Sequence, residues 1–141
     1  MKKKGFTLVE LMVVLVIIVI ISTIGFGGIS LVQIKVKESL WQGKIDMIEK
    51  SAETYGDDNK NRLVSSCVID GVTKNECMSV TVQHLIDTNY IKTDEEDANH
   101  NPVIINETLP EDDANYYANN MNVFIYLEND IVYAKLDYQE S

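Results

Sequence analysis

The sequence predicts an α+β fold: one long N-terminal α-helix, hydrophobic in its first half and amphipathic in its second, packed on a small antiparallel β-sheet. Two observations on the 141 residues predict this fold class. No charged residue interrupts residues 11–34, and apolar residues then continue at helical spacing as far as Tyr55. Near the C-terminus, two runs rich in β-branched and aromatic residues flank a short turn at residues 128–130. The length suits one domain rather than two sizeable ones.

The composition excludes several classes of function. The chain has 12 Lys and Arg against 22 Asp and Glu, and its net charge of -10 argues against binding nucleic acid by neutralising phosphates. Two His and two Cys offer little for a multi-ligand zinc site or for thiol–imidazole catalysis. The sequence also lacks a phosphate-cradling glycine loop, a nucleophile elbow and a paired catalytic carboxylate motif. We therefore expect no enzyme, no cofactor, no metal site and no direct contact with nucleic acid.

The first 34 residues predict a membrane segment. A helix of about 20 apolar residues spans the hydrocarbon layer, and residues 11–34 exceed that length. Three Lys at positions 2–4 predict a cytoplasmic N-terminus and an exported C-terminal part. A secretory signal would need a shorter apolar stretch and a cleavage site, but here the apolar pattern resumes at Ile29. A plain signal anchor remains an alternative.

Glu10 lies at the start of this apolar stretch. A carboxylate within a membrane costs about 2.5–3.5 kcal/mol at mid-depth and less near an interface. Chance placement at the edge of the span would explain it without a role. A partner cation that offsets the desolvation of the carboxylate would give it one.

The segment GFTLVE at residues 5–10, preceded by Lys2–Lys4 and followed by the uncharged helix, resembles the signature of type IV pilins and type II secretion pseudopilins. The resemblance covers residues 1–34 closely. It implies that a prepilin peptidase cuts between Gly5 and Phe6 and N-methylates Phe6. It also implies that Glu10 pairs with the N-terminal amine of a neighbouring subunit. The implied division of the chain is a leader at 1–5, a transmembrane and filament-core helix at 6–34, and a globular head at 35–141 that includes an amphipathic helix at 35–55.

The resemblance implies partners and a location as well. The expected partners are other pilin subunits in a homo- or hetero-polymer, the prepilin peptidase, an inner-membrane assembly platform with its ATPase, and membrane lipid before assembly. The precursor would cross the membrane once, with the head outside, and would end in an extracellular filament. The function implied is a structural subunit of a type IV pilus. The alternatives are a pseudopilin of a type II secretion or competence (DNA-uptake) system, and a membrane-anchored binding module that never polymerises.

The predicted helix has two further features. Its amphipathic half carries one apolar stripe, expected to face the sheet and to end where Gly56 terminates the helix: Ile34, Trp41, Ile45, Ile48, Ala52 and Tyr55. Its apolar half lacks the bending proline that is usual in the family and has Gly25, Gly27 and Gly28 instead. Each glycine costs a helix about 0.8–1 kcal/mol relative to Ala, so we expect bending or local unwinding there. Close contact between helices is an alternative role for these small residues.

The head contains two cysteines in a polar stretch. Residues 57–79 are expected to form a loop with at most one short strand or turn. Cys67 and Cys77 are expected to form a disulfide in an exported domain, and closing so short a loop would contribute about 2–3 kcal/mol. Two free thiols or a metal pair are the alternatives. Residues 80–91 predict a short helix capped by Ser79 or Thr81, with Asn89 in the left-handed exit position.

The rest of the head is acidic and irregular before the final hairpin. Asp97, Asn99 and Asn101 have the spacing that begins a calcium loop, but Pro102 and Thr108 stand where such a loop needs Gly and an acid. A solvated loop is therefore favoured over calcium. Candidate strands are expected at 103–105 and 116–117. Core packing is expected for Trp41 and the tyrosines rather than a carbohydrate platform, and a surface position is expected for His84 and His100.

Overall fold

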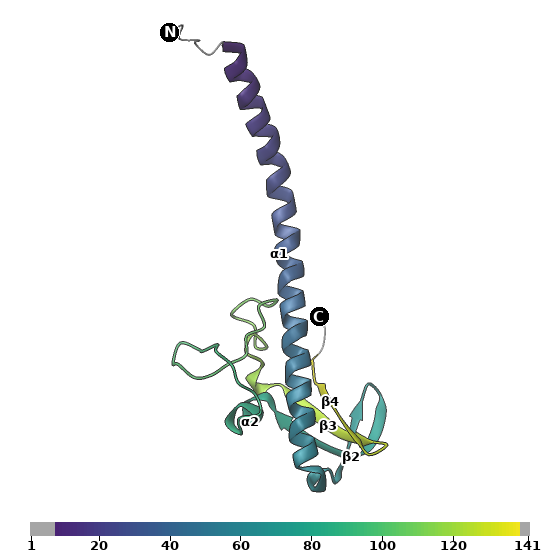
Figure 1. Cartoon of the computed structure of the whole chain (residues 1–141). Helices are drawn as coiled ribbons and strands as arrows, with labels where there is room; N and C mark the ends of the chain where they lie inside the picture. Colours follow the sequence, from purple (N-terminus) through teal and green to yellow (C-terminus); the bar gives the residue numbers. More distant parts are fainter. Residues whose placement is uncertain (1–7, 139–141) are drawn as a thin grey trace, which may run out of the picture. The chain divides into compact units, whose positions relative to one another are not determined.

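The structure is a computed structural model that describes residues 8–138 and, within them, every side chain except those of residues 23–30. The chain divides into two compact units, residues 1–37 and residues 38–141. The elements of the described range are α1 (Leu8–Asp58), η1 (Lys60–Arg62), β1 (Ser65–Ile69), β2 (Val72–Thr81), α2 (Val82–Asp87), η2 (Ala118–Asn120), β3 (Asn122–Glu128) and β4 (Ile131–Leu136). Figure 1 shows them along the chain.

The second unit has the predicted α+β fold. Four antiparallel strands form one sheet in the order β1-β2-β3-β4, and the C-terminal half of α1 packs on it (Figure 1). The helix contributes a stripe of buried residues: Trp41, Ile45, Ile48, Ala52 and Tyr55. The sheet contributes alternate residues of β3 and β4: Val123, Ile125, Val132 and Leu136. The predicted stripe is thus confirmed from Trp41 onward, whereas its first member, Ile34, belongs to the other unit and is 54% exposed.

Gly56 does not end the helix, contrary to the prediction. α1 continues to Asp58, and Gly56 is buried within its last turns. A Cβ at this position would lie 2.5 Å from Ile125 Cγ2 and 2.7 Å from Val132 Cγ1. The glycine is therefore required by the close approach of the helix to the sheet and not by a left-handed backbone.

A hairpin of β1 and β2 begins at Ser65, within residues 57–79, where the sequence predicted a loop with at most one short strand or turn. β1 and β2 pair from Ile69 and Val72 outward, joined by Asp70 and Gly71. Both turn residues have positive φ, 49° and 79°, as a type I′ turn requires. The predicted C-terminal hairpin is confirmed: β3 and β4 pair across a turn in which Asn129 and Asp130 have φ of 53° and 64°.

The helix predicted at 80–91 is shorter than expected. Val80 belongs to β2, and α2 runs from Val82 to Asp87. Thr81 is its N-cap, as predicted, and its Oγ1 accepts a hydrogen bond from the His84 N–H at 3.2 Å. Asn89 adopts the predicted left-handed conformation, with φ of 62°.

The strands predicted at 103–105 and 116–117 are replaced by an isolated antiparallel bridge between Ile105 and Tyr117. In this segment, backbone N–H groups donate to side chains and to single carbonyl groups instead of to a neighbouring strand. The Ile104 N–H donates to Asn119 Oδ1 at 3.0 Å, and the Ile105 N–H donates to Glu95 Oε2 at 2.8 Å. The segment between α2 and η2 is thus an ordered loop held by polar side chains.

Candidate functional site

The residues predicted to act in processing and assembly lie at the start of the chain. Gly5 and Phe6 fall outside the described residues. Glu10 lies near the start of the described part of α1 and is exposed. The backbone is helical at Gly25, Gly27 and Gly28, which lie in the range whose side chains are not described. Their role in bending stays a prediction.

The first unit carries an exposed apolar surface. From Leu8 to Ile21, which we call the apolar segment, the large hydrophobic side chains are between 46% and 76% exposed. They occur on every side of the helix, so no single neighbouring face could cover them. Within the part of the chain that the structure describes, no helix meets the length and apolarity that crossing a membrane requires.

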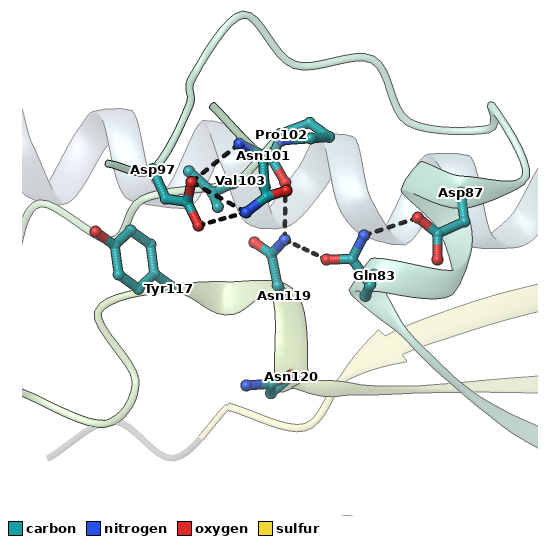
Figure 2. Close-up of a pocket in the computed structure, with 9 residues that line it drawn as sticks. All are labelled: Gln83, Asp87, Asp97, Asn101, Pro102, Val103, Tyr117, Asn119 and Asn120. Atoms are coloured by element: carbon teal, nitrogen blue, oxygen red, sulfur yellow. Dashed lines mark hydrogen bonds between the residues drawn. The ribbon is translucent and has the colours of Figure 1, made fainter. Parts of the chain in front are cut away.

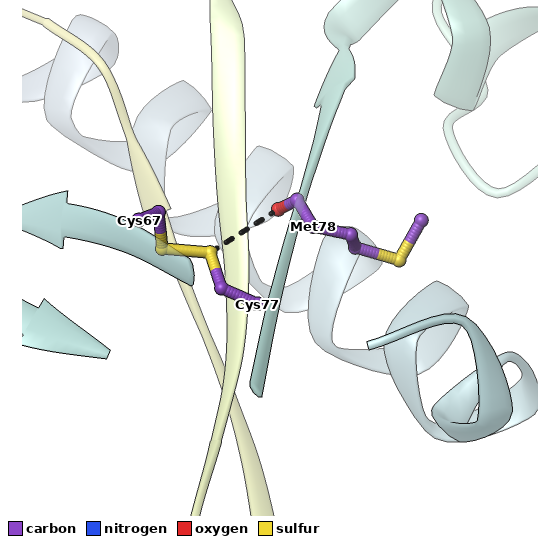
Figure 3. The surroundings of a disulfide bond; sticks show 3 residues. All are labelled: Cys67, Cys77 and Met78. Carbon is purple, nitrogen blue, oxygen red and sulfur yellow. Dashed lines mark hydrogen bonds between the residues drawn. A yellow bond between two sulfur atoms is a disulfide. The ribbon is translucent and has the colours of Figure 1, made fainter. Parts of the chain in front are cut away.

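A disulfide links Cys67 on β1 to Cys77 on β2, as predicted (Figure 3). The two Cα atoms are 5.9 Å apart, and an irregularity in the pairing between Ser65 and Cys67 brings the two cysteines together. Cys77 is 1% exposed and faces away from the core-facing Met78. Its sulfur lies 3.7 Å from the Met78 carbonyl oxygen, a contact without a hydrogen bond because a disulfide sulfur carries no proton.

A half-buried lysine of α1 binds the loop between α2 and η2, here called the acidic loop. Lys44 Nζ donates to Glu95 Oε1 at 2.6 Å and to the Ile105 carbonyl oxygen at 2.8 Å. Glu95 Oε2 accepts the Ile105 N–H, so these three residues form a closed set of hydrogen bonds, here called the Lys44 latch. Sequence reasoning missed it because the lysine and the glutamate are 51 residues apart.

His84 is half-buried, whereas the sequence predicted a surface position. Its Nε2 lies 3.1 Å from the Tyr55 hydroxyl, and the two rings meet edge to face with centroids 5.4 Å apart. Tyr55 also receives a hydrogen bond from Arg62 Nη1 at 3.1 Å. The histidine thus packs α2 against α1. His100 is exposed, as predicted, with its Nδ1 2.9 Å from Glu96 Oε2.

The Asp97 carboxylate accepts hydrogen bonds from residues of its own loop. Oδ1 accepts the backbone N–H groups of Asn99 and Asn101 at 2.8 and 2.9 Å, and both oxygens accept from Asn101 Nδ2. These hydrogen bonds hold the pKa of Asp97 below its ordinary value. Among the described residues, no three His, Cys, Asp or Glu side chains gather in a way that could hold a metal ion. The hydrogen bonds favour the solvated loop over the calcium loop.

A polar cavity of about 460 Å³ lies between α2, the loop around Asp97 and η2 (Figure 2). We call it the polar cavity. It is lined by Gln83, Asp87, Asp97, Asn101, Pro102, Val103, Tyr117, Asn119 and Asn120. Sequence reasoning did not find it because three separate segments form its walls. The only signal was the density of amides and acids at 97–101 and 119–120.

The comparisons with known proteins concern the N-terminus. The family described as the prokaryotic N-terminal methylation motif matches residues 1–26. No curated protein and no solved structure matches the chain. The matched motif is that of prepilins with a class III signal peptide. The match supports a type IV pilin-like or pseudopilin-like prepilin, and proteins of this kind are structural subunits that are not known as enzymes.

The motif carries further implications. It implies processing by a peptidase and assembly with other pilin subunits. It also indicates membrane anchoring followed by a place in a surface filament. The helix packed on a four-stranded antiparallel sheet is the pilin-like arrangement expected from the sequence.

Proposed function

We propose that the chain is the structural subunit of a type IV pilus. The precursor is anchored through its N-terminal helix, is cut between Gly5 and Phe6, and is added to a helical filament by an inner-membrane platform and a cytoplasmic ATPase. The observation that carries the proposal is the apolar segment, which lies within the residues that match the methylation motif and is exposed in the single chain. A surface of this kind needs lipid or other helices around it.

The exposed apolar side chains need to be covered both before and after assembly. Covering a Val, Leu or Ile side chain stabilises a structure by about 1.5–3 kcal/mol relative to water. Lipid and neighbouring helices cover such side chains about equally well, so moving a subunit from one to the other keeps that stabilisation. Packing and polar contacts between helices then decide whether subunits associate.

Glu10 is the polar group at this surface. We assign it to an ion pair with the amine of Phe6 in an adjacent subunit, which cleavage after Gly5 would free. An α-amine has a pKa near 8, so it is largely protonated at neutral pH. A subunit out of register would leave the carboxylate buried without a cation, at a cost of several kcal/mol. The pair therefore favours one register of neighbouring helices.

The proposal is tested by comparing two charge-removing variants in cells that assemble filaments from the unaltered chain. Glu10→Gln removes the carboxylate from the apolar surface. Glu38→Gln is the matched control, because Glu38 is an exposed acid on the same helix beyond that surface. We expect both variants to lose the leader. We expect sheared filament yield to fall at least about tenfold for Glu10→Gln, equivalent to 1.4 kcal/mol, and to stay unchanged for Glu38→Gln.

A non-polymerising anchored module predicts the opposite behaviour. Its N-terminus would stay uncut, and Glu10→Gln would behave like Glu38→Gln. A further variant, Gly5→Leu, separates the steps: it should retain the leader and yield no filaments. Filaments of normal yield from either Gly5→Leu or Glu10→Gln would contradict the proposal.

A further inference from the structure

The polar cavity has walls whose side chains are held in place. Asn119 is 7% exposed, and its Nδ2 donates to Gln83 Oε1 at 2.6 Å and to the Pro102 carbonyl oxygen at 3.0 Å. Its Oδ1 accepts the Ile104 N–H. Gln83 Nε2 in turn donates to Asp87 Oδ1 at 2.8 Å. Figure 2 shows this chain of side chains running from α2 to η2, so Gln83, Asp87 and Asn119 are held in place before any ligand binds.

Several polar atoms of the lining make no hydrogen bond to any residue that the structure describes. They are two acceptors, one hydroxyl and one whole amide: Asp87 Oδ2, Asn101 Oδ1, the Tyr117 hydroxyl and the side chain of Asn120. Together they offer both donors and acceptors. A ligand that carries several hydroxyl groups can satisfy both kinds, because each hydroxyl donates one hydrogen bond and accepts others.

The charge of the cavity lining further limits the classes of ligand that could bind. It contains the two carboxylates of Asp87 and Asp97 and no Lys or Arg, so a phosphate, sulfate or carboxylate ligand would be repelled. A metal ion is also disfavoured. The amide nitrogens of Gln83, Asn101 and Asn119 already donate to lining oxygens that a cation would need as ligands.

We propose that the polar cavity binds one sugar unit of a neutral saccharide. The volume of about 460 Å³ falls within the range of small-molecule sites, about 300–1,000 Å³. Asp87, Asn101 and Asn120 hydrogen-bond the sugar hydroxyls, and the Tyr117 ring lies against the C–H face of the sugar. The proposal is independent of the proposed pilus function, since binding to the cavity requires no assembly.

The test uses the full chain in micelles of lauryldimethylamine oxide, which carries no sugar headgroup. Glucose, galactose, mannose, N-acetylglucosamine and N-acetylgalactosamine are titrated separately and followed by calorimetry and saturation-transfer NMR. We expect at least one to bind with a Kd on the order of 1 mM. Asn120→Ala should weaken that binding by about threefold to tenfold, the fold-change of one net hydrogen bond. Tyr117→Leu should weaken it by at least as much.

Asn115→Ala is the matched control, because Asn115 is an exposed asparagine that does not line the cavity. It should bind the sugar like the unaltered chain. Asn120 is itself exposed, so its variant is expected to fold and decides the result even where Tyr117→Leu is unstable.

Three results would overturn the proposal. The first is no binding of any of the five sugars at roughly 20 mM, well above a millimolar Kd. The second is equal binding of glucuronic acid and the neutral sugars, since the charge argument would then fail. The third is calcium chloride binding that Asp87→Asn abolishes while no sugar competes, which would make the cavity a cation site.

Discussion

Replacing Gly56 by Ala tests how closely α1 packs on the sheet. In a helix interior this change gains about 0.8–1 kcal/mol from helix propensity. At this position the new methyl would lie 2.5 Å from Ile125 Cγ2 and 2.7 Å from Val132 Cγ1, so these buried, β-branched side chains would have to move. Such overpacking costs about 1–3 kcal/mol. We therefore expect a net loss of stability of up to about 2 kcal/mol.

Gly43→Ala is the control, because Gly43 lies in the same helix and a Cβ there meets no atom within 4 Å. It should gain the propensity term alone and become more stable. Guanidinium denaturation followed by circular dichroism gives the free energy of unfolding of both variants in the same detergent. The difference between them should be about 1–3 kcal/mol. Equal gains in stability for the two variants would refute the close packing at Gly56.

Three other perturbations have defined outcomes. Reducing the disulfide should lower the free energy of unfolding by about 2–3 kcal/mol. A Cys67→Ser/Cys77→Ser chain should not respond to the reductant. A denaturation curve of the unaltered chain that does not change on reduction would contradict this prediction. Lys44→Met removes the cation of the Lys44 latch and should destabilise the head by about 1–3 kcal/mol, with the largest loss of amide-exchange protection in the acidic loop. In an NMR titration the pKa of Asp97 should lie below its ordinary value, and Asn101→Ala should raise the Asp97 pKa toward it. Because the folded-state pKa is depressed, the stabilisation by Asp97 is complete above its unfolded-state pKa and is lost as the pH falls through the folded-state pKa.

Features encoded in local pattern were predictable from the sequence. The stripe from Trp41 to Tyr55 follows from helical spacing, and the hairpin of β3 and β4 follows from two β-rich runs around a polar turn. Thr81 caps α2 because a hydroxyl precedes a short apolar pattern. The disulfide was expected from two cysteines in a domain that is predicted to be exported. In each case the decisive residues lie close together in the sequence or have a strong chemical preference for each other.

The errors arose where tertiary packing decides. Gly56 carried the signal of a helix end, but the approach of the sheet explains it. The hairpin of β1 and β2 did have a local signal, the Asp70-Gly71 pair, which the polar composition around it obscured. The Lys44 latch and the polar cavity join segments far apart in the chain, so no local pattern could reveal them.

The proposed function requires that the chain is trimmed at its N-terminus and enters a surface filament. Intact-mass and peptide mass spectrometry of material sheared from the cell surface measures both properties together. We expect a chain that begins at N-methylated Phe6 and lacks residues 1–5. A chain that still begins at Met1, or its absence from the sheared filaments of cells that produce it, would rule out the proposed function.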